Sequence, residues 1–189
     1  MSFRRLLLTT LLLLSGATFI NAQENKCTLK INQAPELRGF RLGMTLEQTK
    51  GQFPFVRVQV SNKFDFHKQG WVTADDLKEN ANFKGVEGLS LTFLDDKLIE
   101  IGVNYDNSIE WKSEEHFSTR VGEMLKLPNA WQRSLNTGYA RQLECDGFQV
   151  RTRVNQINLF NPVEYQNLER RQQEQVERKK EERRQSFKP

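Results

Sequence analysis

The stretch LRGFRLGMTLEQTKGQFP (residues 37–54) contains the most specific structural signal in the chain. Thr45 is followed three residues later by Gln48, which is the spacing of a capping box, where two side chains satisfy backbone amides at the start of a helix. Pro54 cannot continue a helix, because it lacks an amide hydrogen and its ring clashes with the preceding turn. The stretch therefore predicts a helix of about two turns between Thr45 and Pro54.

The residues before this helix predict a tight turn. Gly43 has no side chain, so it either takes a backbone conformation that other residues avoid or lets the turn approach a neighbouring strand. Leu46 and Phe53 lie on one helix face and are expected to point into a core. A helix this short has only marginal stability in isolation. We therefore expect a structural motif that holds the helix against a sheet, made of Gly43, Met44, Thr45 and Gln48.

Apolar and polar residues alternate after this motif, as they do in half-buried strands. Asp95-Asp96 and Asp146-Gly147 each separate two such runs and predict hairpin turns. Ser113 is an N-cap signal for a second helix, with two glutamates in its first turn. The pattern predicts strands at 27–31, 55–60 and 155–160, hairpins over 89–105 and 139–154, and a loop over 61–85 with a short helix near 75–80.

These elements predict an α+β fold, in which short helices pack on an antiparallel β-sheet. A helix, a proline break, a tryptophan and a hairpin occur in that order twice, over residues 45–105 and 113–154. Two helix-plus-hairpin pseudo-repeats and a single α+β domain both account for this order.

The N-terminus has the pattern of a secretory signal peptide. Arg4 and Arg5 precede an apolar run over 6–14, and cleavage is expected after Ala22. The run is shorter than the ~20 residues that a membrane span needs, which disfavours an uncleaved anchor. We therefore expect a signal peptide over 1–22 and an α+β domain over 23–162. The protein should be secreted or periplasmic, with no stable membrane span after cleavage.

Cys27 and Cys145 are the only cysteines. In an exported chain an even number of cysteines predicts a disulfide, and two buried thiols are the alternative. A Cys27–Cys145 bond would tie the N-terminal segment to the hairpin over 139–154. It requires the two Cα atoms to lie within about 7 Å of each other.

Residues 163–189 differ in composition from the domain that precedes them. They contain eight Lys or Arg, six Glu and no glycine. Their five large apolar residues are too scattered for a helix stripe. We therefore expect an exposed helix or a disordered tail that contributes little to the core. Binding of this tail to anionic surfaces is one functional hypothesis.

Residues 23–162 carry eighteen basic and eighteen acidic residues and are therefore neutral. A nucleic-acid-binding domain carries a net basic face, which this balance does not supply. We therefore expect no nucleic-acid partner.

Few residues suit catalysis or metal binding. His67 and His116 are the only histidines, whereas a zinc site needs three or four ligands. The chain has no P-loop, no dinucleotide-binding glycine pattern and no G-x-S-x-G motif. We therefore expect no enzymatic activity, cofactor or metal. The alternative is a small exported enzyme that uses Asp65 with His67, which share a face if they lie on a strand, or His116.

Three tryptophans lie just outside the predicted elements: Trp71, Trp111 and Trp131. Most tryptophans pack on a core, but binding hot spots are also enriched in tryptophan. The preferred hypothesis is an exported, non-enzymatic protein that binds another protein or an envelope component through its sheet or loops. One of these three side chains is then a possible partner contact.

The stretch GFRLGMTLEQTKGQFP (residues 39–54) resembles the helix start of the small outer-membrane-assembly lipoproteins of the SmpA/OmlA (BamE) family. It also resembles that of the β-lactamase inhibitor protein domains. Gly43, Met44, Thr45 and Gln48 match this pattern, whereas Thr49 stands where the family usually has valine, and no lipidated cysteine is present. The resemblance implies one or two short helices on an antiparallel sheet and a binding function without a catalytic site. The stretch also resembles the LGMT…FP opening of uncharacterised exported bacterial proteins, and that resemblance implies no particular activity.

Overall fold

The computed structural model of the chain describes residues 26–61, 63–77, 80–134 and 140–187. The predicted signal peptide over 1–22 lies outside these described residues. None of the described helices is both long enough and apolar enough to cross a membrane.

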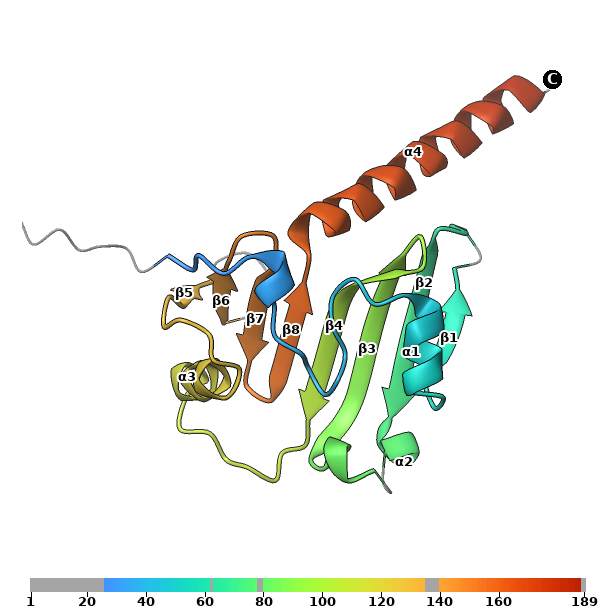
Figure 1. Cartoon of the computed structure of the whole chain (residues 1–189). Coiled ribbons are helices and arrows are strands. Elements are labelled where there is room, and N and C mark those ends of the chain that lie inside the picture. The colour runs from blue at the N-terminus through green and yellow to red at the C-terminus, as the bar shows by residue number, and fades with distance from the viewer. Residues whose placement is uncertain (1–25, 62, 78–79, 135–139, 188–189) are drawn as a thin grey trace, which may run out of the picture.

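The chain forms an eight-stranded antiparallel sheet in the order β1-β2-β3-β4-β8-β7-β6-β5, with helices beside it (Figure 1). This arrangement confirms the predicted α+β class. The strands are β1 (Arg57–Val60), β2 (His67–Thr73), β3 (Val86–Leu94), β4 (Lys97–Tyr105), β5 (Gln132–Arg133), β6 (Arg141–Glu144), β7 (Gln149–Arg153) and β8 (Gln156–Phe160). The helices are α1 (Leu46–Gln52), α2 (Ala74–Leu77), α3 (Glu114–Met124) and α4 (Pro162–Ser186), with 3-10 turns η1 (Ile31–Gln33) and η2 (Ala81–Phe83).

Two four-stranded meanders meet at the middle of the sheet. β1 to β4 follow α1 in the sequence and β5 to β8 follow α3, so a helix followed by four strands occurs twice. β4 pairs with β8 in antiparallel fashion, with Gly102 opposite Asn158. The strand order therefore favours two pseudo-repeats, joined in one sheet over one core.

The core lies between the sheet and the helices α1 and α3 (Figure 1). Strand residues that point to this side are almost fully buried, as alternation along a half-buried strand requires. Leu91 pairs with Ile101 and Val150 pairs with Leu159. Ile101 also lies opposite Leu159, so the apolar row is continuous across both halves of the sheet.

The predicted capping box is present at the start of α1. The Gln48 amide donates to Thr45 Oγ1 over 3.1 Å, and the Thr45 amide donates to Gln48 Oε1 over 2.9 Å. Gly43 has a φ of +84°, and its amide donates to the Leu98 carbonyl over 2.7 Å. The Leu98 amide donates to the Met44 carbonyl over 2.8 Å. Gly43 therefore both takes a left-handed conformation and approaches β4.

The prediction of a loop over 61–85 is wrong for β2 (His67–Thr73). The core-facing positions of β2 are Lys68, Gly70 and Val72, of which only Val72 supplies an apolar side chain. A Cβ at Gly70 would lie 3.2 Å from Leu91 Cβ, so the neighbouring strand fills the space. The strand exists because β1 and β3 pair with it, which local alternation does not reveal.

The prediction of a strand over 27–31 is also wrong, because this segment makes one isolated bridge, between Lys30 and Asp146. The predicted disulfide between Cys27 and Cys145 is present, with Cα atoms 4.7 Å apart. The Asp146 amide donates to the Leu29 carbonyl beside it over 2.9 Å. The bond fits a chain that folds outside the reducing cytoplasm.

The C-terminal tail forms the helix α4, which projects from one end of the sheet (Figure 1). Leu168 is 4% exposed and packs with Leu94 and Ile99, and Tyr165 and Phe66 lie against this second cluster. The expectation that the tail contributes little to the core is therefore wrong for its first turns. Leu168, Tyr165 and Arg171 of α4 thus contact the sheet, with the Arg171 guanidinium carbon 4.1 Å from the centre of the Phe66 ring.

Candidate functional site

The face of the sheet opposite α1 and α3 is polar and largely uncovered by the described helices. Strand alternation places Trp71 of β2 on this side, in the same row as Ser90 of β3. We call this surface the open face. Its exposed side chains are Arg57, Gln59, Gln69, Thr73, Ser90, Asn104, Glu144 and Arg153.

Two small residues, Ser90 of β3 and Gly102 of β4, lie opposite each other on neighbouring strands of the open face. A Cβ on Gly102 would overlap Ser90 Oγ, so no larger residue fits there without a shift. Trp71 lies directly opposite Ser90 on the neighbouring strand and is half-buried. The aromatic ring of Trp71 therefore lies next to the short Ser90 side chain, which fills the space above Gly102.

Hydrogen bonds hold several polar side chains of the open face in place. Glu100 accepts from Thr92 Oγ1 over 2.8 Å and from Asn158 Nδ2 over 2.7 Å. The Arg151 guanidinium carbon lies 4.3 Å from the centre of the Phe160 ring. Side chains fixed in this way lose little further freedom when a partner binds.

The helix α4 covers one end of the open face, where His67 lies. His67 Nδ1 is 3.0 Å from Gln172 Nε2 of α4, while His67 Nε2 is buried without a hydrogen-bond partner. Burial lowers the pKa of His67, and the opposing effect of Glu100 is smaller. Asp65 is exposed and accepts from the Phe66 amide over 3.0 Å, in a turn before β2. Asp65 and His67 therefore do not share the strand face that the sequence suggested.

His116 lies in the first turn of α3, exposed, with its ring centre 5.6 Å from that of Trp111. Among the described residues, neither histidine ring hydrogen-bonds to a serine, a threonine or a carboxylate. The same residues contain no group of three or more His, Cys, Asp or Glu that could hold a metal ion.

The three tryptophans have different environments. Trp111 packs edge-to-face on Phe117, with ring centres 5.0 Å apart. Trp131 lies so close to Gly122 of α3 that a Cβ there would be 3.0 Å from the indole nitrogen. Both pack on the core. Trp71 lies inside β2 and is the one of the three that belongs to the open face.

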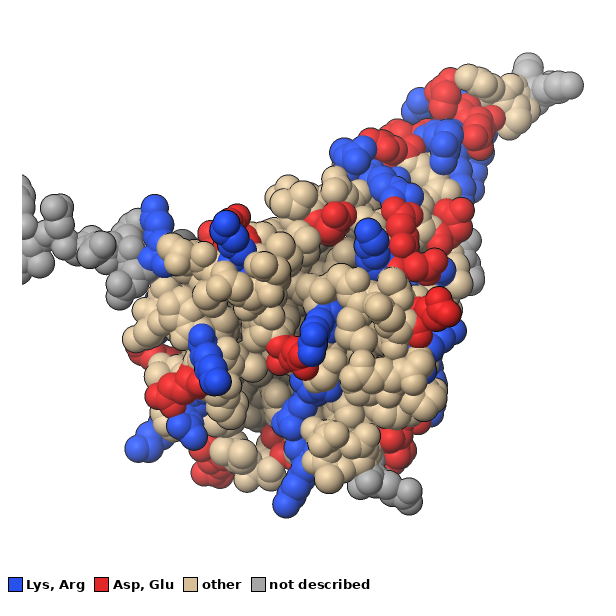
Figure 2. Space-filling model, viewed as in Figure 1, with Lys and Arg blue, Asp and Glu red and all other residues tan. Residues whose placement is uncertain are grey.

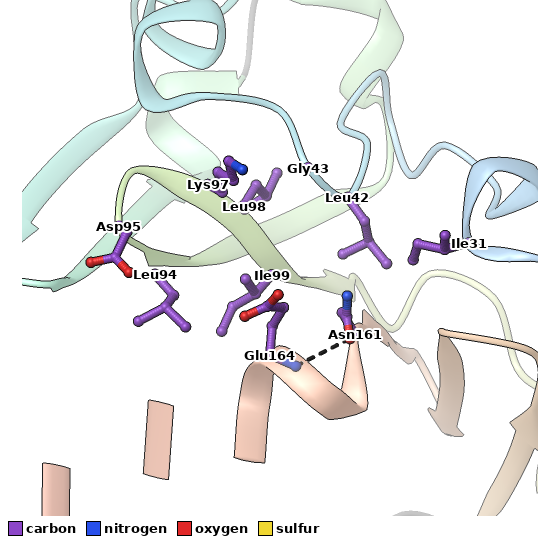
Figure 3. A pocket seen from close by; sticks show the side chains of 10 residues that line it. All are labelled: Ile31, Leu42, Gly43, Leu94, Asp95, Lys97, Leu98, Ile99, Asn161 and Glu164. Atoms are coloured by element: carbon purple, nitrogen blue, oxygen red, sulfur yellow. Dashed lines mark hydrogen bonds between the residues drawn. The ribbon is translucent and has the colours of Figure 1, made fainter. Parts of the chain in front are cut away.

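A cavity of about 270 Å³ lies between the Gly43 turn, the β3–β4 hairpin and the first turn of α4 (Figure 3). Leu42, Leu94 and Ile99 line it with apolar side chains, and its charged lining residues are Asp95, Lys97 and Glu164. The cavity therefore lies where the capping motif, the β3–β4 hairpin and α4 meet.

A second cavity of about 190 Å³ lies between α3, the end of β4 and the segment that joins them. We call it the Trp111 pocket. Its apolar wall is formed by Tyr105, Trp111, Phe117, Val121, Met124 and Ile157, and Ile109 lines it too. On the helix side of the molecule the surface is hollowed between α3 and the end of β4 (Figure 2).

Sequence reasoning missed this pocket. Met124 follows Val121 at helical spacing, which favours burial, but it is 59% exposed, and Ile109 is 58% exposed. The available signal was an isolated isoleucine in the polar run DNSIEWKS (106–113). The cations at the mouth, Arg38 and Lys84, come from distant turns, so no local pattern joins them to α3.

The chain matches no protein-family model, no curated protein and no solved structure. The resemblance of the Gly43–Gln48 motif to outer-membrane-assembly and β-lactamase-inhibitor domains therefore stays a prediction.

Proposed function

We propose that this is an exported, non-enzymatic protein that binds another protein through its open face, with Trp71 as the central contact. The observation that supports this most is the position of Trp71, an aromatic side chain among polar residues of β1, β2 and β3 on the open face, next to the edge of the sheet and outside the end that α4 covers. Tryptophan is strongly enriched among the residues that dominate binding energy.

The size of the open face also supports a protein partner. Neighbouring strands lie about 4.8 Å apart, so eight strands span roughly 34 Å. A standard protein interface needs about 800 Å² on each partner, which a surface of this width provides. Amide and hydroxyl side chains dominate it, so recognition should depend on hydrogen bonds around one aromatic contact.

The signal sequence and the disulfide support export. The apolar run over 6–14 behind two arginines is typical of a secretory leader. The Cys27–Cys145 bond is stable where thiols are oxidised. The partner is therefore expected in the periplasm, the envelope or the external medium.

The test uses the mature protein, residues 23–189, as bait for envelope proteins of the cells that produce it. The captured protein is purified, and its Kd is measured for the wild type, Trp71→Ala and Gln69→Arg. Truncating a hot-spot tryptophan costs about 2 kcal/mol, which weakens binding about 30-fold. The matched control is Lys50→Ala, an exposed change on α1 at the other side of the sheet.

Equal binding by the wild type, Trp71→Ala and Gln69→Arg would overturn the proposal. Binding that instead disappears with Arg183→Ala and Arg184→Ala, and weakens steeply with salt, would favour the hypothesis of a tail that binds anionic surfaces.

A further inference from the structure

The Trp111 pocket gathers exposed apolar side chains over a buried apolar floor. Ile109 and Met124 are 58% and 59% exposed at its mouth, whereas Phe117 and Val121 are almost fully buried beneath them. Single exposed apolar residues are common on protein surfaces and need no explanation. Two of them over one apolar cavity indicate a place where an apolar group is bound.

The volume limits the size of that group. An apolar cavity of ~150 Å³ can hold a benzene molecule, whereas sites for drug-sized ligands begin at about 300 Å³. At about 190 Å³ the Trp111 pocket has room for one six-membered ring or a branched aliphatic chain of similar size.

The pocket is held in shape by hydrogen bonds on both sides of the joining segment. The Asp106 amide donates to the Gly85 carbonyl over 3.0 Å, and Asn155 Nδ2 donates to Asn107 Oδ1 over 2.6 Å. The Ser108 amide donates to Asp106 Oδ1 over 3.0 Å. A ligand therefore meets a wall that is already formed, which reduces the entropy lost on binding.

The mouth of the pocket carries more positive than negative charge. Arg38 and Lys84 line it, and among the described residues no carboxylate forms an ion pair with either of them. Arg38 Nη1 donates to the neutral Asn82 carbonyl over 2.8 Å, and its guanidinium carbon lies 5.2 Å from the centre of the Tyr105 ring. The Asp106 carboxylate also lines the mouth, but it accepts the Ser108 hydroxyl and amide within its own turn.

Basic side chains accordingly lie along one side of the hollow (Figure 2). Two cations against one internally bonded carboxylate leave one positive charge beside an apolar cavity. A ligand that combines an apolar group with a single negative charge would complement both features.

We propose that the Trp111 pocket binds a small apolar carboxylate, whose ring or branched chain fills the cavity and whose carboxylate lies at Arg38 and Lys84. A free acid and the C-terminal residue of a peptide present this same chemistry. The pocket is on the helix side of the sheet, so this inference does not depend on binding at the open face.

The experiment is a calorimetric titration of the mature protein with 3-phenylpropionate and with 3-phenylpropan-1-ol, which has the same ring but no charge. A ligand of this size should bind the protein with a Kd on the order of 1 mM. The alcohol should bind at least tenfold more weakly. The double variant Arg38→Gln/Lys84→Gln should weaken binding of the acid at least tenfold, with little effect on the alcohol.

Two controls locate the effect. Lys112→Gln/Lys126→Gln removes the same charge from exposed positions outside the pocket wall and should leave binding of the acid nearly unchanged. Met124→Glu places a negative charge at the mouth and should abolish binding, whereas Met124→Leu should retain it. A melting curve for each variant confirms that it is folded.

Peptides that end in phenylalanine distinguish a free acid from a peptide C-terminus as the source of the bound carboxylate. Tighter binding of a peptide with a free carboxylate than of 3-phenylpropionate would assign the site to a chain terminus, and weaker binding would assign it to a free acid. Absence of saturable binding, equal binding of acid and alcohol, or an acid affinity unchanged by Arg38→Gln/Lys84→Gln would overturn the proposal.

Discussion

Gly43 lies in the turn before α1 and Gly51 lies in its last turn, and the two glycines have different backbone conformations. Gly43 has a φ of +84°, whereas Gly51 lies inside α1, and a Cβ would meet open space at both positions. Any difference between alanine substitutions at the two sites therefore comes from the backbone and not from steric overlap.

We predict that Gly43→Ala lowers the free energy of unfolding by about 1–2 kcal/mol, because a left-handed conformation strains a residue with a side chain. Gly51→Ala should raise the free energy of unfolding by about 0.5–1 kcal/mol, since alanine favours a helix over glycine. Urea denaturation measures both values. A change of the same sign in both variants would contradict the left-handed turn.

Some side-chain positions were predictable from the sequence and others were not. The Thr45–Gln48 capping box was predictable because both partners are three residues apart and the chemistry is local. The position of Trp71 on the open face was not, because it depends on how β1 and β3 pair with β2.

At the scale of elements, predictability follows the apolar pattern of each segment. The hairpin β3–β4 was predictable from the alternating apolar residues of β3 and from the Asp95-Asp96 turn, where both residues have positive φ. The Trp111 pocket was not, because its cations, Arg38 and Lys84, lie far in sequence from α3. Such a site forms when the folded chain brings distant residues together, and the hydrophobic pattern of a single segment does not encode this.

Among the described residues of α4, Leu168 is the one that is almost fully buried. We predict that Leu168→Ala lowers the stability of α4 docking by about 2 kcal/mol, the lower end for truncation of a buried leucine. Val176→Ala, at a 41% exposed position of the same helix, should change docking stability by less than about 0.5 kcal/mol. Hydrogen exchange of residues 165–175 measures the docking. Equal exchange in the two variants would show that Leu168 does not hold α4.

Docking of α4 should also depend on pH through His67. Burial lowers the pKa of His67 below 6.5, so the unfolded chain binds a proton first as the pH falls. Stability is therefore full above about pH 6.5 and declines as the pH falls toward the pKa of the folded state. We predict that urea denaturation at pH 7.5 and at pH 5 shows a smaller difference for His67→Gln than for the wild type. His116→Gln, an exposed control, should behave as the wild type, and an unchanged difference in His67→Gln would contradict this.

At the scale of the whole molecule, the disulfide joins positions separated by 118 residues. Closing so long a loop restricts the unfolded chain, and the chain-entropy treatment gives an upper value of about 4–5 kcal/mol. We predict that Cys27→Ser/Cys145→Ser lowers the free energy of unfolding by an amount approaching this value. Reduction of the wild-type protein should have the same effect, and a double variant as stable as the oxidised protein would contradict the structural role of the bond.

We propose that the open face, and not the helix side, contacts the partner protein. The most direct measurement places a photo-crosslinking amino acid at Gln69 on the open face and, separately, at Lys50 on α1, in the cells that produce this protein. We predict a crosslinked partner protein from position 69 and none from position 50. Crosslinking from position 50 with none from position 69 would contradict the account.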